Sequence, residues 1–144
     1  MTRMAWGAIG WLLGLGLALL MKPGPAPSGV ALRVVVDPAL EDVAITFPAD
    51  HTILVNPVSA LSLPPALITF LLYHEQAHIA LGHRAGAPAA KLQQELAADC
   101  WASRQARPED RVAAIRFFSA LGSLELPGHP SGTARALEVA RCSP

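Results

Sequence analysis

The sequence predicts an α+β domain, mostly helical, with a short sheet of two or three strands and one N-terminal membrane helix before it. Three observations predict this fold class. Residues 4–21 carry no charge, three short runs rich in β-branched residues lie within residues 30–55, and long segments without proline or glycine follow residue 63. The predicted parts are a membrane anchor or signal segment (1–22), a Pro/Gly linker (23–29) and the folded domain (30–144).

The N-terminal segment is long enough to cross a membrane. Its 18 uncharged residues follow a positive start at Arg3 and reach the length of a transmembrane helix, whereas the core of a signal peptide has about 7–15 residues. Gly24-x-Ala26 loosely fits a cleavage site. We therefore expect a membrane anchor at residues 4–21 and a domain outside the cytoplasm. The alternative is a secreted or periplasmic domain released by signal cleavage.

The composition limits the classes of partner and the number of domains. The chain of 144 residues fits one domain, and its 11 basic and 11 acidic residues give no net charge. Lysine and arginine form no cluster, so we expect no nucleic-acid partner. Cys100 and Cys142 permit one disulfide in an oxidising compartment, and two separate thiols are the alternative.

Strands are expected in the first part of the domain, at Val30–Val36, Val43–Phe47 and Thr52–Val55, because each run ends at a proline-containing turn. Helices are expected after residue 63. The first follows Pro64-Pro65, with Ser62 as a plausible cap, and stops at Gly82. The expected helices are Ala66–Leu81, Lys91–Ala106, Glu109–Leu121 and a last one from the cap Ser131 to about Cys142.

The first of these helices contains the motif His74-Glu75-Gln76-Ala77-His78. Residues four apart lie on one face of a helix, so both imidazoles can reach one ion, and Zn²⁺ accepts nitrogen ligands of this kind. Glu75 points to the side and can act as a general base without binding the metal. A surface helix with two solvated histidines is a poor alternative, because apolar residues flank the motif on both sides.

The third metal ligand is expected at Glu95, 17 residues after His78. A histidine six residues after His78 would complete another type of site, but Arg84 stands there, and we expect His83 to be an exposed helix-end residue. Asp99 lies four residues after Glu95, on the same helix face. Asp99 can accept the N–H of a ligating histidine and fix its tautomer.

These spaced motifs resemble the gluzincin pattern of zinc peptidases. With His129-Pro130 followed by Arg135, they are most similar to the family of CAAX-prenyl and HtpX-type membrane peptidases. The resemblance implies a zincin-like helical core with an edge strand along the cleft, one catalytic Zn²⁺ and hydrolysis of peptide bonds. The chain looks like a minimal version, since it lacks the multiple membrane spans of large members, and Gln76 replaces a small or apolar residue.

The expected function is therefore zinc-dependent hydrolysis of a peptide or protein substrate at or near a membrane. Glu75 acts as general base, and His129 and Arg135 are candidate donors to the oxyanion; a turn histidine and a surface arginine are the alternatives. We expect the substrate to add as a strand to Thr52–Val55, unless that run is a plain core strand. A non-catalytic, zinc-binding interaction or regulatory module tethered to a membrane is the alternative function.

Overall fold

The computed structural model describes residues 31–84 and 86–144. The predicted membrane segment at residues 4–21 and the linker at 23–29 lie outside this range. Within it, no helix combines the length and the apolar character that crossing a membrane requires. The described part is α+β with a three-stranded sheet, as the sequence predicts, and it contains five α-helices, one more than predicted for this range.

The sheet is formed by β1 (Arg33–Val36), β2 (Ala44–Phe47) and β3 (Thr52–Val55) in the order β1-β3-β2. β1 runs parallel to β3, and β2 runs antiparallel to it. The prediction that Thr52–Val55 is the edge is therefore wrong. β3 is the central strand, with Ile53 and Val55 almost fully buried, and β2 is an edge strand beside the helices.

A short helix that the sequence analysis did not predict follows the sheet. It is α2 (Pro57–Leu61), which begins two residues after β3 ends. A separate 3-10 turn, η1 (Pro48–Asp50), connects β2 to β3. The Asn56 side chain accepts hydrogen bonds from the N–H groups of Val58 and Ser59, and Pro57 occupies the first helical position. An N-cap followed by proline starts a helix without any hydrophobic period, which explains why so short an element was missed.

The four predicted helices are present with small shifts at their ends: α3 (Pro65–Ala80), α4 (Pro88–Gln105), α5 (Pro108–Leu121) and α6 (Gly132–Cys142). The Ser131 hydroxyl caps α6 by accepting from the N–H of Ala134, as predicted. Ser62 does not cap α3, whose first turn begins at Pro64-Pro65 without a side-chain cap.

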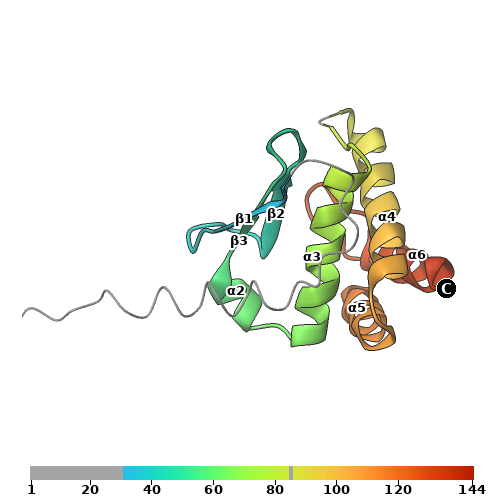
Figure 1. Cartoon of the computed structure of the whole chain (residues 1–144). Coiled ribbons are helices and arrows are strands. Elements are labelled where there is room, and N and C mark those ends of the chain that lie inside the picture. The colour runs from blue at the N-terminus through green and yellow to red at the C-terminus, as the bar shows by residue number, and fades with distance from the viewer. Residues whose placement is uncertain (1–30, 85) are drawn as a thin grey trace, which may run out of the picture.

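Helix α3 lies between the sheet and the other helices (Figure 1). On one side Leu67 and Phe70 pack into a core with α4, α5 and α6, and Phe70 meets Phe118 edge to face. On the other side Ile68 and Leu72 pack against the strands. The helix that carries the histidine motif is therefore held from two sides, which fixes its side chains relative to both layers.

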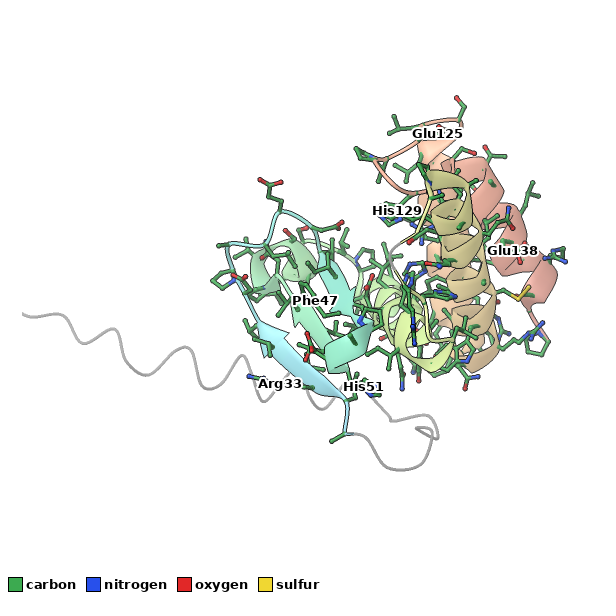
Figure 2. All side chains as sticks on the ribbon, turned by 90° about the horizontal axis from the view of Figure 1, so that it is seen from above. Arg33, Phe47, His51, Glu125, His129 and Glu138 are labelled. Carbon is green, nitrogen blue, oxygen red and sulfur yellow. A yellow bond between two sulfur atoms is a disulfide. The ribbon has the colours of Figure 1, made fainter. Side chains whose placement is uncertain are left out.

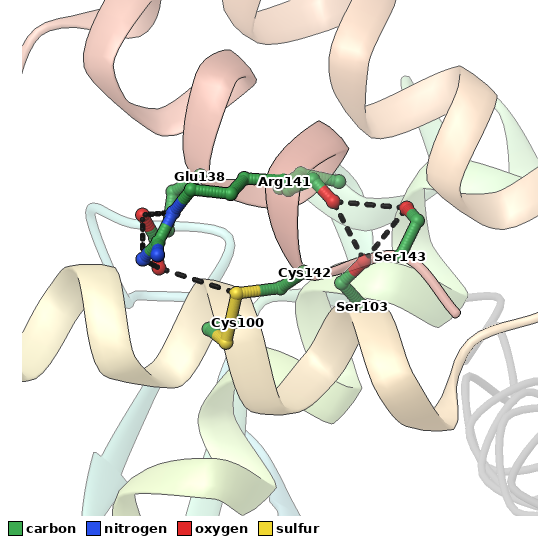
Figure 3. The surroundings of a disulfide bond; sticks show 7 residues. Cys100, Ser103, Glu138, Arg141, Cys142 and Ser143 are labelled. Atoms are coloured by element: carbon green, nitrogen blue, oxygen red, sulfur yellow. Dashed lines mark hydrogen bonds and ion pairs between the residues drawn. A yellow bond between two sulfur atoms is a disulfide. The ribbon is translucent and has the colours of Figure 1, made fainter.

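A disulfide joins Cys100 on α4 to Cys142 on α6 (Figure 3). Of the two alternatives left open by the sequence, the bridge is the one that forms. Next to it, the Ser103 hydroxyl donates a hydrogen bond to the carbonyl oxygen of Val139. These links tie the helix that carries Glu95 and Asp99 to the helix that carries Arg135.

Candidate metal centre

Three side chains from two helices converge on one point. His74 and His78 lie one turn apart on α3, and Glu95 faces them from α4. The two Nε2 atoms are 3.2 Å apart. Glu95 Oε2 lies 3.2 Å from His74 Nε2, and Glu95 Oε1 lies 3.6 Å from His78 Nε2. The spacing of four residues on α3 and the packing of α4 against it bring the three predicted ligands together.

The geometry fits one zinc ion. Zn²⁺ bonds nitrogen and oxygen at about 2.0–2.2 Å in a tetrahedral arrangement, which sets neighbouring ligand atoms about 3.3 Å apart. The three distances above lie close to this value. His74 and Glu95 are almost fully buried, at 2% and 4% exposure, so the site is shielded from water on the protein side. The chemistry of two imidazoles and one carboxylate also suits this ion.

Asp99 fixes the orientation of His74. Its Oδ1 lies 2.8 Å from His74 Nδ1, and its carboxylate is fully buried. A proton on Nδ1 donates to Asp99 and leaves Nε2 free for a metal. Burial alone raises the pKa of Asp99, but hydrogen bonds from Arg135 and the proximity of His74 outweigh this effect and lower it. Asp99 therefore has the geometry expected of it from the sequence.

Arg135 lies against Asp99 and not in the cleft. Its Nε donates to Oδ2 at 2.8 Å and its Nη2 to Oδ1 at 2.7 Å, and the guanidinium stacks 4.0 Å from the ring centre of Phe118. Arg135 is only 7% exposed. The expectation that it donates to an oxyanion does not fit this placement, because its donors face a buried carboxylate. Its contacts are those of a positioning residue that holds Asp99 in place.

The carboxylates of Glu95 and Asp99 favour a positive charge at the centre. Burial lowers the pKa of His74, yet the charge and hydrogen bond of Asp99, with a further bond from Glu95, raise it to about 9. Burial and the neighbouring His74 lower the pKa of His78 to about 4. Without metal, a proton on His74 thus sits between two carboxylates, and an ion bound at the same point would take its place.

Glu75 lies in the cleft next to this centre without belonging to the converging set. The Thr46 hydroxyl on β2 lies 2.6 Å from Glu75 Oε2 and 2.9 Å from the Glu75 carbonyl oxygen. Burial raises the pKa of the Glu75 carboxyl, partly offset by His74 and by Thr46. Sequence reasoning missed Thr46. Side chains two residues apart lie on the same face of a strand, so Thr46 shares a face with the buried Ala44. This alternation is the one sequence signal that places Thr46 toward the interior.

Two further histidines contact the ligands. His129, between α5 and α6, donates from Nδ1 to Glu95 Oε2 at 2.6 Å. Burial alone would raise the pKa of Glu95, and the hydrogen bonds from His129 and His74 lower it. His83 Nδ1 lies 2.9 Å from His78 Nδ1, and His83 is half-buried. The prediction that His83 is an exposed helix-end residue is therefore wrong, because the turn after Gly82 folds its ring back onto α3.

The centre opens into a cleft of about 450 Å³ between the sheet and the helices. Its walls are β2 with the residues around it, the motif face of α3, the turn after α3, the start of α4 and the segment around His129. Figure 2 looks down on this region, with Phe47 of β2 on the sheet side and His129 on the helix side. The predicted residues Glu75, His78, Glu95 and His129 line the cleft, whereas Asp99 and Arg135 support it from behind.

A second group of potential ligands, Cys100, Glu138 and Cys142, lies outside the cleft. It offers no thiolates, because the two sulfur atoms are bonded to each other. Comparison of the chain with protein-family models, with curated proteins and with solved structures gives no match.

Proposed function

We propose that this chain is a zinc metallopeptidase of the gluzincin type with a zincin-like fold. The observation that carries the proposal is the convergence of His74, His78 and Glu95 beside a cleft that also contains Glu75. The three atoms lie at separations that suit one Zn²⁺ ion, and three protein ligands are the usual number at a catalytic zinc. The resemblance of the sequence to this class agrees with the same residues.

The ligands are prepared for the metal by their neighbours. Asp99, held by Arg135, keeps the proton of His74 on Nδ1, and His83 faces the corresponding nitrogen of His78. When bound, Zn²⁺ supplies Lewis acidity to water and to the scissile carbonyl group. The supporting contacts keep the imidazoles in the tautomer and orientation that such binding requires.

Glu75 acts as the general base in this proposal. It takes a proton from the attacking water and delivers it to the leaving amine. Its burial raises the carboxyl pKa, which makes it a stronger base than an exposed glutamate, and Thr46 holds one of its oxygens. His129 lines the same cleft and remains our candidate donor to the oxyanion, through the ring nitrogen that does not contact Glu95.

We propose that the substrate strand adds to β2. In residues 31–84 and 86–144, β2 pairs only with β3, which leaves its other edge without a strand partner. Ala44, Ile45 and Thr46 of this strand line the cleft next to Glu75. A peptide paired with this edge would pass the general base, and main-chain hydrogen bonds would hold it there. This assignment replaces Thr52–Val55, which lies in the centre of the sheet.

The setting that we propose is a membrane-anchored domain outside the cytoplasm. The uncharged run of residues 4–21 supports the anchor, with release after signal cleavage as the alternative. The Cys100–Cys142 disulfide supports an oxidising compartment, because such bonds rarely persist in a reducing cytosol. The partner is a peptide or protein substrate, and no basic cluster supports a nucleic-acid partner.

The test is metal analysis of the full-length chain, followed by digestion of a peptide library with and without chelator. We expect one zinc ion per chain and chelator-sensitive cleavage. Glu75→Gln should keep the zinc and lose cleavage, whereas the exposed Glu41→Gln, a matched change outside the cleft, should keep both. A Glu75→Gln protein as active as the parent refutes the base. Stoichiometric zinc with no cleavage of any peptide would favour the non-catalytic zinc module instead.

A further inference from the structure

Two cationic side chains line the cleft without an anionic partner. Arg84 lies in the turn after α3, and Lys91 lies in the first turn of α4. Neither side chain makes a hydrogen bond or an ion pair with any residue in 31–84 or 86–144. Among the described arginines, Arg107, Arg135 and Arg141 have carboxylate partners. Arg84 therefore belongs with the unpaired ones, and it differs from them in lining the cleft.

The Lys91 side chain lies against Gly128. Gly128 has a φ of +80°, and a Cβ added there would meet Lys91 Nζ and would lie only 2.9 Å from Cε. The Lys91 side chain thus lies across the glycine, next to the segment that carries His129. It lines the active cleft and also a neighbouring hollow formed by the residues around Pro127. Lys91 is exposed and lines the cleft, so a bound peptide can reach its ammonium group.

The charges of the cleft leave this region positive. Glu75 and Glu95 together carry two negative charges next to the expected position of one doubly charged ion. The other charged residues of the cleft wall are Arg84 and Lys91 and, beside β2, Asp42. With the central charges balanced, Arg84 and Lys91 face the cleft on the helix side and Asp42 lies on the sheet side. Glu125 lies outside the cleft, in the neighbouring hollow that Lys91 also lines. An anionic group of a substrate is favoured near the cations and disfavoured near Asp42.

We propose that Lys91 and Arg84 form a subsite for a carboxylate group of the peptide substrate. The carboxylate belongs either to an acidic side chain or to the C-terminus of the peptide. This inference rests on the proposed function for its meaning, since it names the class of substrate that the cleft selects. It can nevertheless be tested by binding alone, because both side chains lie in the cleft wall whether or not turnover follows.

The experiment measures peptide binding to the full-length, zinc-loaded Glu75→Gln protein by fluorescence anisotropy. A labelled peptide with one glutamate is compared with its glutamine counterpart, and a peptide acid with its amide, which separates the two sources of the carboxylate. At least one carboxylate should improve Kd by about fivefold at low salt, the size expected for two solvent-exposed ion pairs. Lys91→Gln with Arg84→Gln should remove this preference and leave binding of the neutral peptide unchanged.

Arg104→Gln is the matched control, because Arg104 is an exposed arginine at the far end of α4 and does not line the cleft. It should keep the full preference. Equal binding of charged and neutral peptides, no binding of either, or a preference that survives the double substitution would each overturn the subsite. Carboxylate-selective binding to a parent protein that cleaves nothing would instead overturn the proposed hydrolysis and leave the subsite standing.

Discussion

Replacing Arg135 by methionine removes the guanidinium that contacts the fully buried carboxylate of Asp99. Asp99 is 0% exposed and accepts from Arg135 at 2.7 Å and 2.8 Å, and its remaining contact is His74 Nδ1 at 2.8 Å. Methionine keeps most of the side-chain volume next to Phe118 but supplies no donor. The change therefore leaves His74 as the one remaining partner of the Asp99 carboxylate, with little loss of packing.

The expected cost follows from this geometry. Breaking a buried ion pair by removing one partner costs about 3–5 kcal/mol when the other charge stays buried and uncompensated. Because His74 still faces Asp99, we expect Arg135→Met to lose about 3 kcal/mol of the free energy of unfolding, the lower end of this range. Asp99→Asn combined with Arg135→Met should recover a large part, because removing both charges is often close to neutral. The two changes should thus be strongly non-additive.

Urea unfolding followed by circular dichroism measures these free energies. Arg141→Met is the matched control, since Arg141 pairs with Glu138 on the surface and is largely exposed, so its loss should change the free energy of unfolding far less. Zinc affinity supplies a second readout and should fall about 10–100-fold in Arg135→Met, because Asp99 would then hold a proton on His74 more strongly. A loss no larger than that of Arg141→Met would refute the role assigned to Arg135.

Three more predictions concern the metal centre and the disulfide that joins two of its supporting helices. Replacing both Cys100 and Cys142 by serine opens a link between residues 42 positions apart and should cost about 4 kcal/mol of stability, measured by urea unfolding. His83→Ala should weaken zinc about tenfold in a competition titration with a chromophoric chelator, because His78 loses a hydrogen-bonding partner, whereas His83→Gln, which keeps an acceptor, should lose less. The pKa of His74 is raised to about 9 without metal, so zinc must displace its proton below that pH. Calorimetry in buffers of different ionisation enthalpy should show release of about one proton per zinc at pH 7 and fewer above pH 9. The apparent affinity for zinc should fall about tenfold per pH unit as the pH decreases from 9 to 7. Zinc binding without proton release at pH 7 would contradict a protonated His74.

The site could be predicted from the sequence where its residues share one helix or neighbouring helices. His74 and His78 are brought together by the helical period alone, and this period was readable in the sequence. Glu95 and Asp99 needed one further step, the packing of the second helix against the first. The short connection between the two helices makes that packing the natural outcome, and both carboxylates lie within hydrogen-bond distance of His74.

The strand order could not be predicted in the same way. All three strands have four residues, and a run of this length carries little information about which strand becomes central. Thr46 and His83 were missed for a related reason. Thr46 reaches Glu75 only because β2 is the strand beside α3, and His83 reaches His78 only because the chain reverses at Gly82 with a φ of +64°. Both contacts depend on tertiary geometry that no local pattern specifies.

The late motif shows how one pattern can serve two purposes. His129 and Arg135 are six residues apart, and the sequence suggested the same role for both. In the fold, the turn at His129 reaches Glu95 at the front of the centre, while Arg135, one turn into α6, reaches Asp99 behind it. His129 thus contacts Glu95 and Arg135 contacts Asp99, so each acidic residue of α4 has one of these two residues as a partner. Together the two contacts hold α4 from two sides.

The placement of Glu75 weighs in favour of catalysis over a purely structural zinc site. A structural site gains nothing from a half-buried carboxylate that lies next to the ligands but is not bound with them, because partial burial makes its charge costly, as its raised pKa reflects. Three converging ligands and an adjacent cleft also differ from a closed site with four protein ligands. Groups that are kept despite such a cost are commonly functional. If Glu75→Gln raised stability and left zinc binding unchanged while abolishing cleavage, it would show that the fold accepts this cost for the sake of the reaction.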